Sequence, residues 1–195
     1  MAPSTSSTSV MSVVAVLLLL FPIAPAISSS DQAILGACKT VGGGSTYFDV
    51  QFCEEAIGSA AGGGASLDYQ VFAGLAVGLL ADNATSTKAK IDRLIQGGSG
   101  DGNVKLNVGD DAALGCCLLS CRKLYGGIVE SRPTCTAAVK TGKFGEATAL
   151  LEKAAAAVKK CEDGFGKSNV TSPLMAEDDD AYKLAKLGVA LLRFA

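Results

Sequence analysis

The sequence predicts an all-α protein: an antiparallel up-and-down four-helix bundle with an N-terminal helical hairpin extension, stapled by disulfides. Apolar residues recur at helical spacing in four long segments, and glycine-rich breaks separate these segments. The alternating apolar and polar runs that are typical of strands are missing. The chain also has seven cysteines, all after an apolar N-terminal run that is typical of exported proteins.

The N-terminus predicts an export signal. Residues 10–24 (VMSVVAVLLLLFPIA) are apolar, and the run ends in small residues around Ala26 that suit signal peptidase. We expect a signal peptide over residues 1–28, cleaved near residues 26–28, and a single mature domain over residues 29–195. No Lys or Arg precedes the apolar run, so an uncleaved anchor is the alternative. We expect no later membrane helix and no membrane contact once the signal is removed.

Residues 29–62 are expected to form the hairpin. The strings DQAILGACKT and YFDVQFCEEAIGSA flank the break at residues 42–44, and each can form a short helix. Asp49 is placed to cap the second of them. Glycines at 62–64 then interrupt the chain, and the bundle is expected over residues 66–195.

The first two bundle helices are predicted over residues 67–97 and from residue 110 onward. The first has a polar middle, DNATSTKAK, that could break it, although no Gly or Pro forces a break. A loop is expected at 97–110. Pro133 should kink or end the second helix, because proline removes a backbone donor and clashes with the preceding turn.

The last two bundle helices are predicted over about 144–161 and after the acidic cluster at 177–180. Gly142 breaks the chain before the third helix. Acidic residues at the start of the fourth suit the helix dipole. The expected apolar stripe of the last helix comprises Tyr182, Ala185, Leu187, Leu191, Leu192 and Phe194. No second domain is expected.

The composition excludes several function classes. The chain has no histidine, so Ser-His-Asp and Cys-His nucleophiles are impossible and the commonest zinc ligand is missing. A formal net charge of −2 with few aromatic residues argues against nucleic-acid binding. Acidic runs such as 178–180 are expected at helix starts or on solvated faces, which argues against a carboxylate active site. We therefore expect no enzyme activity, no cofactor and no metal.

Three features concern modification in an oxidising compartment. Seven cysteines is an odd number, so at least one thiol stays unpaired or pairs outside the chain. The cysteines at 116, 117, 121 and 135 lack the paired spacing of a zinc site, which favours disulfides. Asn83 and Asn169 each begin an N-glycosylation sequon, so both are candidate glycosylation sites.

The cysteine pattern resembles that of the plant pectin methylesterase inhibitor and invertase inhibitor family over the whole mature chain. The matching strings are ALGCCLLSCRKLY at 113–125 and CEDGF at 161–165, together with the exported hairpin-plus-bundle plan. The resemblance implies a hairpin disulfide Cys38–Cys53 and a bundle disulfide Cys121–Cys161. It also implies that the polar middle of the first bundle helix stays helical.

The resemblance implies inhibition by binding. Family members form a stoichiometric complex with a cell-wall carbohydrate enzyme and cover its active-site cleft. Pectin methylesterase is the first expected target and cell-wall or vacuolar acid invertase the second. A secreted structural or pollen-type bundle without inhibitory activity is a third alternative. The expected location is the apoplast or cell wall, with the vacuole as an alternative.

The turn before the third bundle helix does not decide the target, because pectin methylesterase inhibitors of the family often have a similar Gly-x-aromatic turn. Invertase inhibitors of the family present Pro-Lys-Phe here, and this chain has Gly142, Lys143 and Phe144. Lys143 and Phe144 are therefore candidate contacts to the target enzyme. The alternative is that Phe144 belongs to the core.

Cys116, Cys117 and Cys135 exceed the four cysteines of the family. A bridge from Cys135 to either of the other two would need the helix to end or fold back near Pro133. We expect at least one free buried thiol.

Overall fold

The computed structural model describes residues 29–61, 68–96 and 112–195, and the expected signal peptide at 1–28 lies outside this part of the chain. The described residues are all helical apart from turns and connections, so the all-α prediction is confirmed. The helices are α2 (Ser29–Gly42), α3 (Val50–Ala60), α4 (Tyr69–Ile95), α5 (Ala112–Lys140), α6 (Phe144–Lys167) and α7 (Met175–Leu192).

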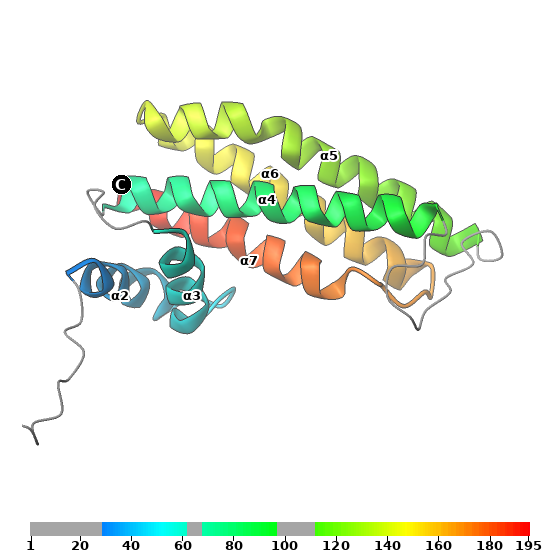
Figure 1. Ribbon diagram of the computed structural model, residues 1–195, viewed down its shortest axis with the longest axis horizontal. Helices are drawn as coiled ribbons and strands as arrows, with labels where there is room; N and C mark the ends of the chain where they lie inside the picture. Colours follow the sequence, from blue (N-terminus) through cyan, green and yellow to red (C-terminus); the bar gives the residue numbers. More distant parts are fainter. Residues whose placement is uncertain (1–28, 62–67, 97–111) are drawn as a thin grey trace, which may run out of the picture.

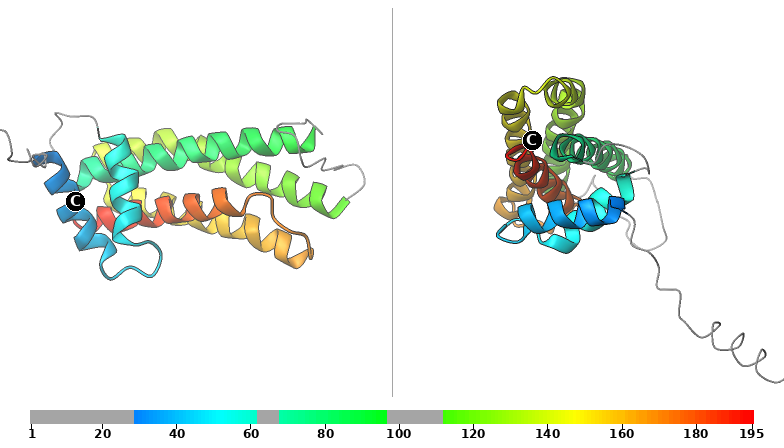
Figure 2. Two further views of the ribbon diagram at one scale, coloured as in Figure 1. Left: turned by 60° about the horizontal axis from the view of Figure 1, so that its bottom comes forward. Right: turned by 90° about the vertical axis from the view of Figure 1, so that its left-hand side faces the viewer.

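Helices α4 to α7 form the bundle (Figure 1). Helix α4 packs against α5 and α7, and α6 packs against the same two helices, so each helix lies beside its neighbours in the sequence and the ring closes between α4 and α7. The beginnings of α4 and α6 and the ends of α5 and α7 meet at one end of the bundle. We call this the hairpin end, because α2 and α3 lie there (Figure 2).

Helix α4 is continuous through its polar middle, as the family resemblance implied. It begins at the cap Asp68, whose side chain accepts a hydrogen bond from the backbone N–H of Val71. Within the polar stretch, Ala84 and Thr87 are buried at helical spacing. The core contact therefore spans the stretch, and tertiary packing keeps it helical.

For Pro133 of α5 the sequence predicted either a kink or the end of the helix, and the structure excludes the end. The helix does not end there but continues to Lys140 with Pro133 inside it. Pro133 is exposed, while Cys135 and Val139 are buried beyond it. Packing of the last two turns thus offsets the lost backbone hydrogen bond.

The sequence predicted that no segment after the signal is long and apolar enough to cross a membrane. Helix α5 contradicts this, because its length and composition would allow it to do so. Core helices of bundles pass the same test, and α5 packs against both α4 and α6.

The last two helices differ from their predicted bounds. Helix α6 runs to Lys167, one and a half turns beyond Cys161, because Phe165 is buried and extends its apolar face. Helix α7 begins at Met175, so the acidic cluster lies inside its first two turns rather than ahead of it. Phe194 lies beyond the helix and is exposed, with its ring against that of Tyr69.

Small residues bring the bundle helices close together. Gly188 of α7 faces Leu151 of α6, and a Cβ at Gly188 would lie 2.9 Å from a Leu151 methyl carbon. Alanines 76, 154, 181 and 185 are buried in the same core. This agrees with the close packing expected of alanine-rich faces.

The hairpin is anchored through both its helices. Asp49 caps α3 by accepting from the Phe52 N–H at 2.8 Å, as predicted. Helix α3 packs on α4, and α2 contacts α7. Phe48 and Ile57 of the hairpin join the same apolar core as the bundle.

Candidate functional site at the hairpin end of the bundle

The turn between α5 and α6 is a glycine-terminated helix end. Gly142 has φ +72°, its N–H donates to the Val139 carbonyl, and the Lys143 N–H donates to the Ala138 carbonyl at 2.9 Å. This is the Schellman arrangement, which favours glycine because the left-handed region costs other residues energy. Proline, with φ near −65°, cannot occupy this position. The turn therefore differs from one built on Pro-Lys-Phe.

The two candidate contact residues have different surroundings. Lys143 is exposed and caps α6 without a side-chain hydrogen bond. Phe144 is half-buried and packs against the core. From the sequence, Phe144 was expected to be either a contact to the target enzyme or a core residue. The structure allows both, because part of the residue packs on the core and part is accessible.

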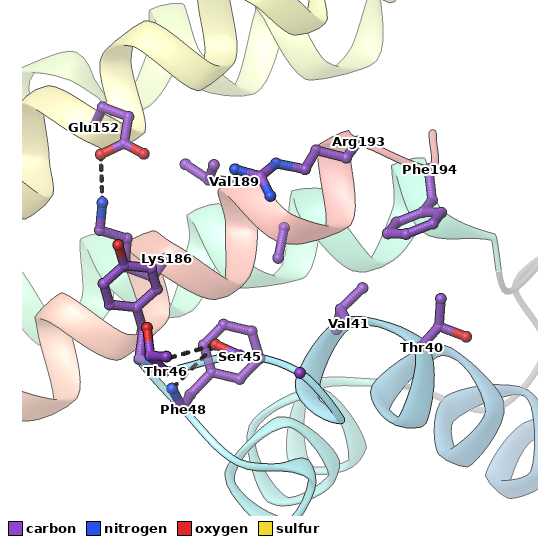
Figure 3. Close-up of a pocket in the computed structure, with 13 residues that line it drawn as sticks. Thr40, Val41, Ser45, Thr46, Phe48, Glu152, Lys186, Val189, Arg193 and Phe194 are labelled. Atoms are coloured by element: carbon purple, nitrogen blue, oxygen red, sulfur yellow. Dashed lines mark hydrogen bonds and ion pairs between the residues drawn. The ribbon is translucent and has the colours of Figure 1, made fainter.

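A cavity of about 330 Å³ lies between the hairpin and α7 (Figure 3). The loop after α2 forms one wall, where the Ser45 hydroxyl accepts hydrogen bonds from the N–H groups of Tyr47 and Phe48. The other wall is formed by Val189 in the last turn of α7 and by Arg193 and Phe194, which follow the helix. The cavity therefore marks the joint at which the hairpin meets the bundle.

Lys186 connects three elements at this joint. Its ammonium group donates to Glu152 of α6 at 2.6 Å and lies 4.9 Å from the ring centroid of Tyr47 and 5.6 Å from that of Tyr182. Burial alone would lower the pKa of Lys186, but the hydrogen bond and charge of Glu152 raise it overall. Lys186 thus remains charged and holds the hairpin loop against α6 and α7. Sequence reasoning missed this cluster, because its members come from three separate segments.

Two disulfides are present, in the pairs that the family resemblance implies. Cys38–Cys53 joins α2 to α3 with 5.5 Å between the Cα atoms. Cys121–Cys161 joins α5 to α6 with 4.9 Å between the Cα atoms. All four residues are buried. They restrain the hairpin and the bundle without forming a reactive site.

The three remaining cysteines are free: Cys116 is exposed, while Cys117 and Cys135 are buried. Because α5 is continuous, Cys135 lies about 27 Å along the helix axis from Cys117, which excludes a bridge between them. Burial raises the pKa of Cys135 to about 11, so its thiol stays protonated. The Cys117 thiol donates to Ser168 Oγ at 3.3 Å.

The acidic run at 178–180 corrects another expectation, because one of its members lies inside the protein. Asp178 is 3% exposed and its Oδ1 accepts a hydrogen bond from the buried Tyr125 hydroxyl of α5. The spacing from Asp178 to Ala181 and Ala185 puts all three on one helical face, a signal that the sequence contained. Asp179 and Asp180 are exposed, as expected.

The two sequons have different settings. Asn83 is half-buried in the middle of α4, and its Oδ1 accepts from the Thr87 hydroxyl at 3.3 Å. Asn169 is exposed in the connection after α6, with φ +58°. Only Asn169 presents a free side chain to solvent.

Over the described ranges, no group of three or more His, Cys, Asp or Glu side chains is arranged to hold a metal ion. The surface elements at the hairpin end are instead an exposed cation, a half-buried ring and a stapled hairpin. Such an arrangement suits recognition of another protein.

The comparison with protein families agrees with this interpretation. A family model described as plant invertase/pectin methylesterase inhibitor matches residues 32–191. The match therefore includes both hairpin helices and almost the whole bundle. No curated protein matches the chain.

Proposed function

Because this chain belongs to the plant invertase/pectin methylesterase inhibitor family, we propose that it is a secreted inhibitor of pectin methylesterase that docks over the active-site cleft of its target. Members of the family are proteinaceous inhibitors of pectin methylesterase or invertase. The target, the location in the apoplast and the docking mode are the proposed part. The family match over residues 32–191 is the observation that carries the proposal.

The scaffold supports inhibition by binding. A protein that blocks a cleft gains affinity when its surface is already in the bound shape, because less conformational entropy is lost on association. Here one disulfide ties α5 to α6, a second ties α2 to α3, and Lys186 holds the hairpin loop against the bundle. The hairpin disulfide and the Lys186 contacts act at the hairpin end, which makes that end the preferred docking surface, whereas Cys121–Cys161 restrains the half of the bundle away from it.

The turn at Gly142 supports pectin methylesterase over invertase as the target. Invertase inhibitors that this chain resembles present Pro-Lys-Phe at this turn, and the positive φ of Gly142 is incompatible with proline. Phe144 also packs against the core, so only part of its ring is available to contact a target enzyme. This chain therefore has the lysine of the invertase-type contact, but the backbone turn before that lysine is different.

Acid invertase is the second candidate, and Lys143 is the observation that favours it. The side chain is exposed on the surface where family inhibitors place their lysine. A cation at this position can pair with carboxylates in the cleft of a glycosidase.

The decisive experiment titrates purified protein against pectin methylesterase and acid invertase at mildly acidic pH. Stoichiometric loss of pectin methylesterase activity with intact invertase is the expected result. Loss of invertase activity only would replace the proposed target with the second candidate. No effect on either enzyme would place the chain in the non-inhibitory class.

Lys143→Ala tests the contact residue, with Lys167→Ala as the matched control. Both lysines are exposed, and they lie at opposite ends of α6. If the hairpin end docks, Lys143→Ala weakens binding of the inhibited enzyme severalfold while Lys167→Ala does not. Equal affinities for the two variants would contradict docking through this turn.

A further inference from the structure

Four side chains, one from each bundle helix, form a polar chain through the core. Tyr125 of α5 is fully buried and donates to Asp178 Oδ1 of α7. Thr87 of α4 is 1% exposed, its hydroxyl donates to Asn83 Oδ1, and it lies near the Tyr125 hydroxyl. Glu162 of α6 lines the same groove between α6 and α7 as Asp178. An apolar four-helix bundle does not need such a chain for its packing.

Two oxygen atoms of this chain lack hydrogen-bond partners. Asp178 Oδ2 and Glu162 Oε2 are both buried, and no donor among the described residues reaches either. Two ionised carboxylates side by side would repel each other and leave both oxygens unsatisfied. A single proton held between the two groups removes the repulsion and supplies the missing hydrogen bond.

We propose that Glu162 and Asp178 form a proton-binding site, in which a carboxylic acid–carboxylate pair ties α6 to α7. The ligand of this site is one proton taken from solvent. Loss of the proton leaves two negative charges between the helices and weakens their contact. The inference concerns the fold of this chain and does not depend on the enzyme that it inhibits.

The cations of the surrounding elements are committed elsewhere. Lys90 of α4 pairs with Glu177 at 2.6 Å, and Lys183 of α7 pairs with Asp179 at 2.6 Å. A groove of about 390 Å³ runs beside the pair between α6 and α7. It is lined by Val158, Lys159, Glu162, Asp163, Met175, Asp178, Asp179 and Tyr182.

Only Lys159 brings positive charge to this groove without an ion pair in the described structure, and it is exposed. Lys90 and Lys183 partly offset the negative charges of Glu177 and Asp179, whereas Asp163 adds a negative charge that has no ion pair in the described structure. The local field therefore favours uptake of a proton.

The raised pKa of Asp178 agrees with a proton held at this site. Burial raises the pKa of Asp178 to about 7; the Tyr125 hydrogen bond opposes this, while Glu162 and Glu177 add to it. The folded protein thus keeps a proton that the unfolded chain, with an ordinary Asp pKa, releases above about pH 4. The free energy of unfolding should therefore fall as pH rises from about 4 to about 7.

The test compares urea unfolding midpoints from about pH 4 to about pH 8 for the wild type, Asp178→Asn and the control Asp163→Asn. Asn at 178 accepts from Tyr125 and donates to Glu162 at every pH, as the protonated acid does. We expect the midpoint of the wild type and of Asp163→Asn to fall across this range and that of Asp178→Asn to fall much less. Equal slopes in all three proteins would overturn the proposal.

Glu162→Gln keeps the proposal testable if Asp178→Asn fails to fold, because Gln supplies the same missing donor from α6. It too should flatten the pH dependence. Infrared spectra near pH 6 should show a carboxylic acid band that both variants lose. If ammonium chloride raises the urea midpoint of the wild type near pH 8 to its value near pH 4, and choline chloride does not, the site binds ammonium. The proposal of a proton site would then be wrong.

Discussion

The Cys121–Cys161 disulfide should stabilise the protein more than the Cys38–Cys53 disulfide does. The two bridges close loops with sequence separations of 40 and 15 residues. In the chain-entropy model these lengths correspond to about 4 and about 3 kcal/mol of stability at 25 °C, because a longer loop restricts the unfolded chain more. Both bridges are buried, so a difference in solvent exposure does not complicate the comparison of the two.

The double variants Cys121→Ala/Cys161→Ala and Cys38→Ala/Cys53→Ala isolate the two contributions. Urea unfolding followed by circular dichroism would give the free energy of unfolding of each against the wild type. For a domain of about 165 residues, about 4 kcal/mol corresponds to a fall of roughly 8–16 °C in Tm. The three free cysteines stay in both variants, so nonreducing mass spectrometry must show that no new bridge forms.

Two outcomes would refute the reasoning. If the bundle variant loses less than about 1 kcal/mol, then its unfolded state is already compact and the entropy argument fails. If the hairpin variant loses more than the bundle variant, loop length does not govern the difference. A hairpin that unfolds locally, with an unchanged bundle transition, agrees with the smaller expected loss.

Substitutions at four other positions test three local features. Gly142→Ala should lower stability by about 1 kcal/mol and Gly142→Pro by more, because φ +72° suits neither residue, and a thermal melt that leaves Gly142→Ala unchanged would contradict this turn. Pro133→Ala should raise stability by about 1–2 kcal/mol in urea unfolding, because it restores a helix hydrogen bond; a loss would show that proline is required there. Of the two sequons, Asn169→Gln should remove a glycan from protein expressed through a secretory pathway, and Asn83→Gln should not. A mobility shift confined to Asn83→Gln would reverse that assignment.

Local sequence pattern predicted most of the secondary structure. Helical spacing located the four bundle helices, the glycine break at 42–44 separated the two short helices of the hairpin, and Asp49 capped α3 as expected. The errors arose where packing outweighed local preference. Pro133 lies inside α5 because buried residues on both sides hold the helix, and α6 extends past Cys161 to bury Phe165. Helix propensity depends on residues close in the sequence, whereas burial depends on residues brought together by the fold.

The candidate site was predictable only in part. The string Gly142-Lys143-Phe144 identified the turn, but only the backbone showed a positive φ that proline cannot adopt. The cluster around Lys186 brings together residues from the hairpin loop, α6 and α7, and no spacing within one segment reveals it.

The sequence by itself determined the helical composition, the lack of histidine chemistry and the cysteines available for the two bridges, because these depend on residue type and short-range periodicity. Only the tertiary structure decided which member of the acidic run is buried and which oxygens lack donors. Charge runs are normally solvated, and Asp178 differs from its neighbours because its helical face meets Tyr125 and Glu162 from other helices. Burial and pairing depend on residues far apart in the chain, so they are settled only when the helices pack.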